Sequence, residues 1–137
     1  MSLPYLDTDV LIRYITGDDP GKQARSATLL AQVEAGTLTL AAPATVFADA
    51  VFVLSSKILY HLPRAQVAAI LIPLVRLSHL KVKNRRALLA ALDLYATSSL
   101  DFGDCMIVAS MKQDRSKTVY SFDQGFDKVL GIKRLEP

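Results

Sequence analysis

Three aspartates lie beside apolar segments of the chain, where an acidic side chain is unfavourable to bury. Asp7 ends an apolar run near the start, Asp104 precedes a second run, and Asp123 follows a third. Each has a structural explanation, because an acid can also cap a helix or occupy a turn. Three carboxylates that met in space would raise one another's pKa unless a cation neutralised them. The three acids are therefore the first candidates for a metal site.

The remaining residue types indicate which metal such a site would hold. His61 and His79 are isolated, and the single cysteine, Cys105, cannot build a cysteine zinc cluster. An all-oxygen ligand set suits Mg²⁺ or Mn²⁺. A cation of this kind lowers the pKa of a bound water and binds phosphate oxygens, and two ions would lie about 3.5–4 Å apart. The chemistry predicted from these residues is hydrolysis of a phosphodiester.

Short β-like and longer helix-like segments alternate along the chain, and they must position these acids. The pattern predicts an α/β fold with a mainly parallel sheet in one domain over residues 1–137. In such sheets, ligands gather beyond the carboxyl ends of the strands, where Asp7 and Asp123 would lie. The predicted strands are 4–7, 37–42, 80–82, 118–122 and 132–135. The predicted helices are 9–15, 22–35, 43–59, 63–77, 85–97 and 101–113, with Gly36 as the C-cap of the second.

The composition is that of a globular protein. Of the 137 residues, 51% are hydrophobic and 21% charged, which argues against disorder. We expect no membrane segment, because the apolar runs are too short to span a bilayer. The lone Cys105 excludes an internal disulfide, and no secretory signal is visible, so a cytoplasmic location is expected. The formal net charge is +3, and basic residues crowd 81–86, either as a solvated face or as a contact for RNA.

Four segments in a fixed order resemble the PIN-domain family, and in particular the VapC-type toxins of toxin–antitoxin pairs. They are residues 6–14, 48–54, 100–104 and 122–127. The resemblance covers nearly the whole chain. It implies a three-layer α/β/α sandwich around a central, mainly parallel sheet of four or five short strands. It further implies Mg²⁺-dependent cleavage of RNA as a type II toxin, a homodimer and an antitoxin protein as partner.

The resemblance also implies roles for individual residues. Asp7 corresponds to the first metal ligand of the family, and Asp104 to the third. Asp123 corresponds to the fourth acid, which in the family often holds a second ion or a water. Thr8 and Ser121 match polar positions that commonly line the site.

The chain departs from the family at Asp49, where Glu is usual. Asp has one methylene fewer, so its carboxylate reaches roughly 1–1.5 Å less far. Mg²⁺ requires ligand distances of about 2.0–2.1 Å, so Asp49 either binds through a water or needs its helix to lie closer. Cleavage activity would then be weaker, or the metal preference of the site would shift from Mg²⁺ towards Mn²⁺. Asp101 lies one helical turn before Asp104, and we interpret it as an N-cap in preference to a ligand.

Two alternatives remain open at the level of sequence. The first is a catalytically impaired PIN-fold module that binds RNA or protein. The second is a haloacid-dehalogenase-like phosphatase, because Asp7-Thr8-Asp9-Val10 also resembles the nucleophile motif of that class. The phosphatase interpretation needs a second acid four residues after Asp104, and Val108 stands there.

Overall fold

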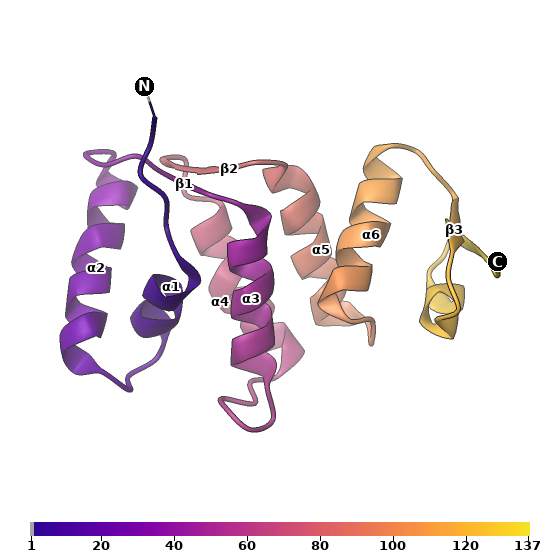
Figure 1. Cartoon of the computed structure of the whole chain (residues 1–137), viewed down its shortest axis with the longest axis horizontal. Coiled ribbons are helices and arrows are strands. Elements are labelled where there is room, and N and C mark those ends of the chain that lie inside the picture. The colour runs from indigo at the N-terminus through magenta and orange to yellow at the C-terminus, as the bar shows by residue number, and fades with distance from the viewer. Residues whose placement is uncertain (1) are drawn as a thin grey trace.

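The computed structural model describes residues 2–137 and confirms the α/β class (Figure 1). In chain order the elements are α1 (Thr8–Ile15), α2 (Pro20–Ala35), β1 (Leu40–Ala42), α3 (Ala44–Ser55), α4 (Arg64–Val75), β2 (Leu80–Val82), α5 (Arg85–Thr97), α6 (Phe102–Gln113), β3 (Thr118–Tyr120), the 3-10 helix η1 (Gln124–Lys128) and β4 (Lys133–Leu135). No helix in residues 2–137 is long and apolar enough to cross a membrane.

Local signals in the sequence set both ends of α2. The carboxylate of Asp19 accepts a hydrogen bond from the amide of Lys22 and caps α2, which starts with Pro20. Gly36 ends α2 in the left-handed region at φ 80°, as predicted, because a residue without Cβ adopts that conformation at little cost. The helix predicted over 43–59 is shorter than expected. The helix ends at Ser55 and the chain then turns back, so that the amide of Leu62 donates a hydrogen bond to the carbonyl of Leu54.

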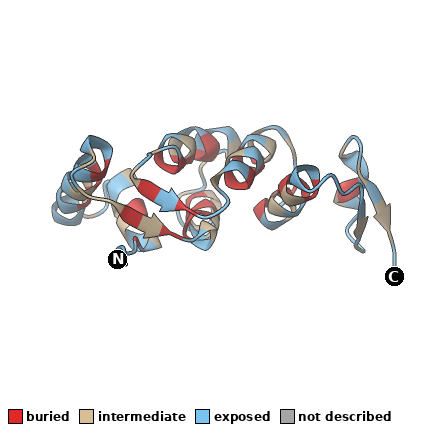
Figure 2. Ribbon diagram, turned by 90° about the horizontal axis from the view of Figure 1, so that it is seen from above, coloured by how far each residue is buried: buried red, intermediate tan, exposed pale blue. Residues whose placement is uncertain are grey.

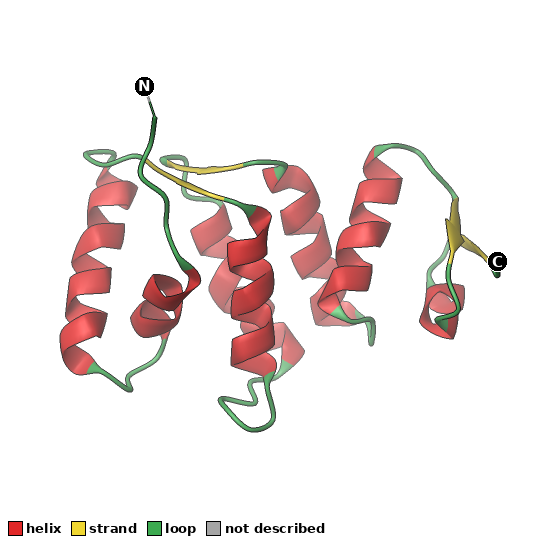
Figure 3. Cartoon of the chain, viewed as in Figure 1, coloured by secondary structure: helices red, strands yellow, loops and turns green. Residues whose placement is uncertain are grey.

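The strands form two separate parallel pairs and not the single central sheet that was predicted (Figure 3). β1 pairs with β2, and β3 pairs with β4. The strand expected over 4–7 is reduced to one bridge, between Tyr5 and Ala41, beside β1. The two pairs lie far apart: α1 and α2 are at one end of the molecule, β3 is at the other, and α3 to α5 lie between them (Figure 1). A three-layer sandwich around one sheet is therefore not what a single chain shows.

The hydrophobic core lies among the central helices (Figure 2). Its largest fully buried side chains include Phe47 of α3, Leu71 of α4 and Leu88 of α5. The C-terminal segment contributes less, and η1 brings one buried side chain, Phe126, into the same cluster. This segment is mostly exposed in Figure 2, so the core supports it on one side only.

Candidate active site

The first part of the site lies where α1 meets α3. Asp7 is the N-cap of α1, and its carboxylate accepts a hydrogen bond from the amide of Thr8 at 2.7 Å. The hydroxyl of Thr8 donates to the carbonyl of Val46 at 3.3 Å, which joins the start of α1 to the first turn of α3. Asp49 follows Val46 by three residues on α3, and both Asp7 and Asp49 are exposed. Asp7 is thus a solvated cap and not the buried strand-end acid that the sequence suggested.

The second part of the site lies at the start of α6. Asp104, in the first helical turn, is half-buried. Burial raises the pKa of its carboxyl group most, and the charges of Asp123 and Asp101 and a hydrogen bond with Asp123 raise it further. Asp104 and Asp123 are therefore neighbours across some 19 positions of sequence. A carboxyl pair with this unfavourable charge is the electrostatic setting that a divalent cation relieves.

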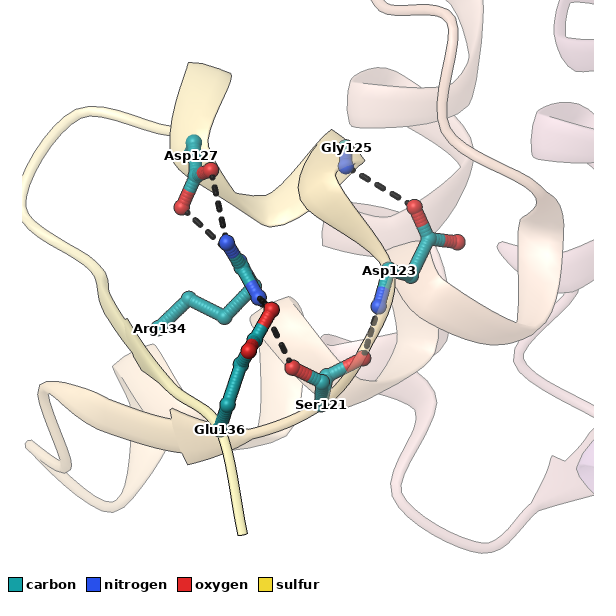
Figure 4. A network of polar contacts seen from close by, with 6 residues as sticks. All are labelled: Ser121, Asp123, Gly125, Asp127, Arg134 and Glu136. Atoms are coloured by element: carbon teal, nitrogen blue, oxygen red, sulfur yellow. Dashed lines mark hydrogen bonds and ion pairs between the residues drawn. The ribbon is translucent and has the colours of Figure 1, made fainter.

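The loop that carries Asp123 is held in place by hydrogen bonds (Figure 4). The hydroxyl of Ser121 accepts a hydrogen bond from the amide of Asp123 at 2.9 Å, and the carboxylate of Asp123 accepts one from the amide of Gly125 at 2.8 Å. Arg134 of β4 donates to both carboxylate oxygens of Asp127 and to the carbonyl of Ser121. Ser121, predicted to line the site, thus orients the acid that follows it.

Asp101 takes the N-cap position of α6, as predicted, but its side chain makes no capping hydrogen bond. Its position depends on Arg64, a residue that the sequence did not single out. The guanidinium of Arg64 lies 3.8 Å from the ring centroid of Tyr95 and donates to the carbonyls of Tyr95 and Leu100. Arg64 follows a proline at the start of α4, and no local pattern would have identified it.

A groove runs between α3 and the start of α6, next to this second group of acids. Its lining includes the cationic or titratable side chains Lys57, His61 and Arg64, the exposed aromatic Phe52, and Asp101. His61, which the sequence left as an isolated residue, lies at this groove. Three of the basic residues of 81–86 lie elsewhere, at a second groove beside Tyr5 and β1: Lys81, Lys83 and Arg85.

The predicted acids are thus found in two groups. Asp104 and Asp123 lie together, with Asp101 nearby, whereas the expected convergence with Asp7 is absent: residues 2–137 contain no group of three or more His, Cys, Asp or Glu that could hold a metal ion. The reason is that residues 4–6 lie beside β1 while β3 pairs with β4, so the two strand ends do not share an edge.

A family model described as PIN domain matches residues 5–131, which is most of the chain. No curated protein matches the chain with significance.

Proposed function

Because the chain belongs to the PIN-domain family, we propose that it is a metal-dependent endoribonuclease that hydrolyses RNA phosphodiester bonds. PIN domains are commonly nucleases, often metal-dependent ribonucleases. The observation that carries the proposal is the neighbouring pair Asp104 and Asp123: burial of Asp104 and the nearby charge of Asp123 both raise the pKa of Asp104. In this proposal the catalytic acids are Asp7, Asp49, Asp104 and Asp123.

The acid pair fits a Mg²⁺ or Mn²⁺ ion. Such an ion is usually held by one or two carboxylates together with waters and substrate phosphates, and Asp104 and Asp123 meet that requirement. When bound, the ion supplies a water of lowered pKa and a Lewis acid for the phosphate oxygens. The chain's own contribution is to hold the two carboxylates: α6 fixes Asp104, and Ser121 and Gly125 fix Asp123.

The groove beside the acid pair suits a single-stranded RNA. Lys57 and Arg64 carry the positive charge that attracts phosphates, and Phe52, which is 74% exposed, offers a ring on which a base can stack. Because Asp101 and Gly103 line the same groove, a strand bound there passes the start of α6, where Asp104 lies. We therefore assign substrate binding to this groove in preference to the basic residues of 81–86.

The test is cleavage of a mixed RNA pool by purified protein in Mg²⁺ or Mn²⁺. Asp104→Asn is expected to lower the rate at least about 100-fold, since the loss of a metal ligand removes several kcal/mol of transition-state stabilisation. It is also expected to weaken Mn²⁺ binding measured by calorimetry, a readout that does not depend on turnover. Asp93→Asn, which changes an exposed acid on α5, is the matched control and should leave both measurements unchanged.

The outcome that contradicts the proposal is a wild-type protein that neither cuts RNA nor binds Mn²⁺. Binding of RNA without cleavage would favour the non-catalytic alternative. Asp49→Glu then decides whether the shorter acid is the cause: a large gain in cleavage shows that Asp49 impairs the site, and an unchanged rate shows that it is tolerated.

We further propose that the protein is the toxin of a type II toxin–antitoxin pair, acting in the cytoplasm as a homodimer that an antitoxin inhibits. Exposed apolar side chains such as Ile58, Leu59 and Leu130 offer surface for a protein partner. Expression of the wild type, but not of Asp104→Asn, should then arrest growth. A small DNA-binding protein encoded beside the gene should relieve the arrest, and its failure to do so would remove the toxin assignment.

A further inference from the structure

The β3–β4 pair is an incomplete sheet. Parallel strands occur almost only in sheets that are covered on both faces, and a two-stranded sheet is marginal alone. Yet β3 is largely open to solvent: Tyr120 is 70% exposed, and Phe122, just after the strand, is 73% exposed. The sequence of this strand is apolar and β-forming, which is typical of a buried strand, yet in a single chain the strand is exposed.

The outer edge of β3 carries unpaired backbone groups. The carbonyl of Lys117 and the amide of Ser121 form hydrogen bonds with backbone groups of β4. In the register of this pair, Thr118 lies opposite Lys133. Successive residues of a strand direct their backbone groups to opposite sides, so those of Thr118 and Tyr120 point away from β4. No backbone partner for them occurs in the described part of the chain. This edge is open to another parallel strand.

The N-terminal segment has a matching free edge. The amide of Leu6 donates a hydrogen bond to the carbonyl of Ala41, and the amide of Ala41 donates one to the carbonyl of Pro4. The N···O distance is 2.9 Å in both. By the same alternation, the amide and carbonyl of Tyr5 face away from β1. The ring of Tyr5 is 74% exposed. A strand added here would pair with Tyr5 and cover its ring.

These two edges cannot meet within one chain as it is folded. β3 follows α6 after only the four residues 114–117, which span at most about 14 Å. Helix α6 packs on α5, at the end of the molecule opposite α1 and the N-terminal segment (Figure 1). While α6 stays packed on α5, the short connection 114–117 keeps β3 at this end of the molecule, whereas a second copy can bring its own residues 4–6 to β3.

We propose that β3 of one copy adds in parallel to residues 4–6 of a second copy, reciprocally, and that each active site is thereby built from two chains. Asp7 follows residues 4–6 directly, and Asp123 lies just after β3. Parallel pairing of these two segments therefore places both acids at the same edge of the sheet. One copy then supplies Asp7 and Asp49, and its partner supplies Asp104 and Asp123. The inference rests on the proposed function for the role of these acids. The pairing itself rests on the two free edges.

The first experiment measures mass and needs no activity. Wild-type protein is expected to sediment as a dimer at micromolar concentration. Tyr120→Pro removes the amide that faces the second copy and is expected to give a monomer, whereas Tyr120→Val keeps the amide and should remain a dimer. Tyr5→Pro tests the other edge in the same way, and circular dichroism shows whether each variant keeps its helices.

A wild-type monomer, or a dimer that survives both proline substitutions in folded protein, overturns the proposal whether or not the protein cuts RNA.

The second experiment is complementation. Asp7→Asn and Asp104→Asn, each inactive alone, are unfolded and refolded together. Half of a random mixture is heterodimer, and each heterodimer has one intact and one doubly substituted site, so about a quarter of wild-type cleavage should return. The matched control mixes Asp104→Asn with Asp123→Asn, which change the same half of the site and should restore nothing.

Equal failure of both mixtures, beside an active wild type, would place all four acids in one chain and overturn the inference while leaving the proposed function intact. An inactive wild-type protein that is nonetheless a dimer, and that both proline substitutions convert to a monomer, would overturn the proposed function and leave the strand pairing intact.

Discussion

Replacing Arg64 with methionine tests whether one side chain holds the corner before α6. The guanidinium donates to the carbonyls of Tyr95 and Leu100, two buried residues, and lies over the ring of Tyr95. Arg64→Met keeps an unbranched stem but removes both hydrogen bonds and the charge. The corner between α5 and α6 then loses its anchor to α4.

The size of the effect follows from these contacts. A hydrogen bond from a charged donor contributes about 1.5–3 kcal/mol, and a cation over an exposed ring about 0.5–1 kcal/mol. Two such bonds and the ring contact would sum to roughly 3.5–7 kcal/mol if they were fully buried. Because Arg64 is half-buried and water can replace part of what it supplies, we expect a loss of about 2–4 kcal/mol in the free energy of unfolding.

The assay is urea unfolding followed by circular dichroism, with equal m-values required for the comparison. Arg86→Met is the matched control, since Arg86 is exposed on α5 and a surface substitution changes stability by only about 0.5 kcal/mol. A difference between the two variants of less than roughly 1 kcal/mol would refute the anchoring role, because it would fall in the range of ordinary surface changes.

Two further predictions concern the ends of α2. Gly36→Ala should destabilise the protein by about 1–2 kcal/mol, since φ is 80° and the new Cβ would lie 2.9 Å from Nε2 of His79; Gly17→Ala, where a Cβ meets nothing, should be near neutral in the same urea titration. Asp19→Ala should lower the melting temperature at pH 7. The backbone hydrogen bond from Lys22 lowers the pKa of Asp19, so its stabilisation is complete above the unfolded pKa of about 3.9 and is lost as the pH falls through the lower folded value. The difference in melting temperature should therefore shrink in acid, and a difference that stayed constant from pH 7 to pH 2 would show that the carboxylate charge is not the cause.

Some features of the fold could be predicted because they are decided within a few residues. The helix predicted over 85–97 and the strand over 80–82 have the bounds of α5 and β2. Gly36 ends α2 because only a residue without Cβ adopts its conformation easily. Helix periodicity, capping and left-handed glycine are local properties, and they need no knowledge of what the segment will pack against.

The candidate site was predictable in part for the same reason. An acid in the first turn of a helix and an acid after a strand can be located by position, and the structure brings Asp104 and Asp123 together. The role of Arg64 could not be found in this way, since its partners Tyr95 and Leu100 are more than 30 positions away. Distant partners of this kind become visible only after α4, α5 and α6 have packed.

The sequence by itself determined the PIN family, the α/β class and the acids that are the candidates for a metal site. Only the tertiary structure decided how those acids are distributed, with Asp7 and Asp49 near α1 and α3, and Asp104 and Asp123 at the far end. The hydrophobic pattern of a strand predicts that the strand will be buried, but it does not predict which strand edge the strand will pair with. That choice depends on where α6 docks, and because α6 packs on α5 the strand that follows it is carried away from the N-terminal edge.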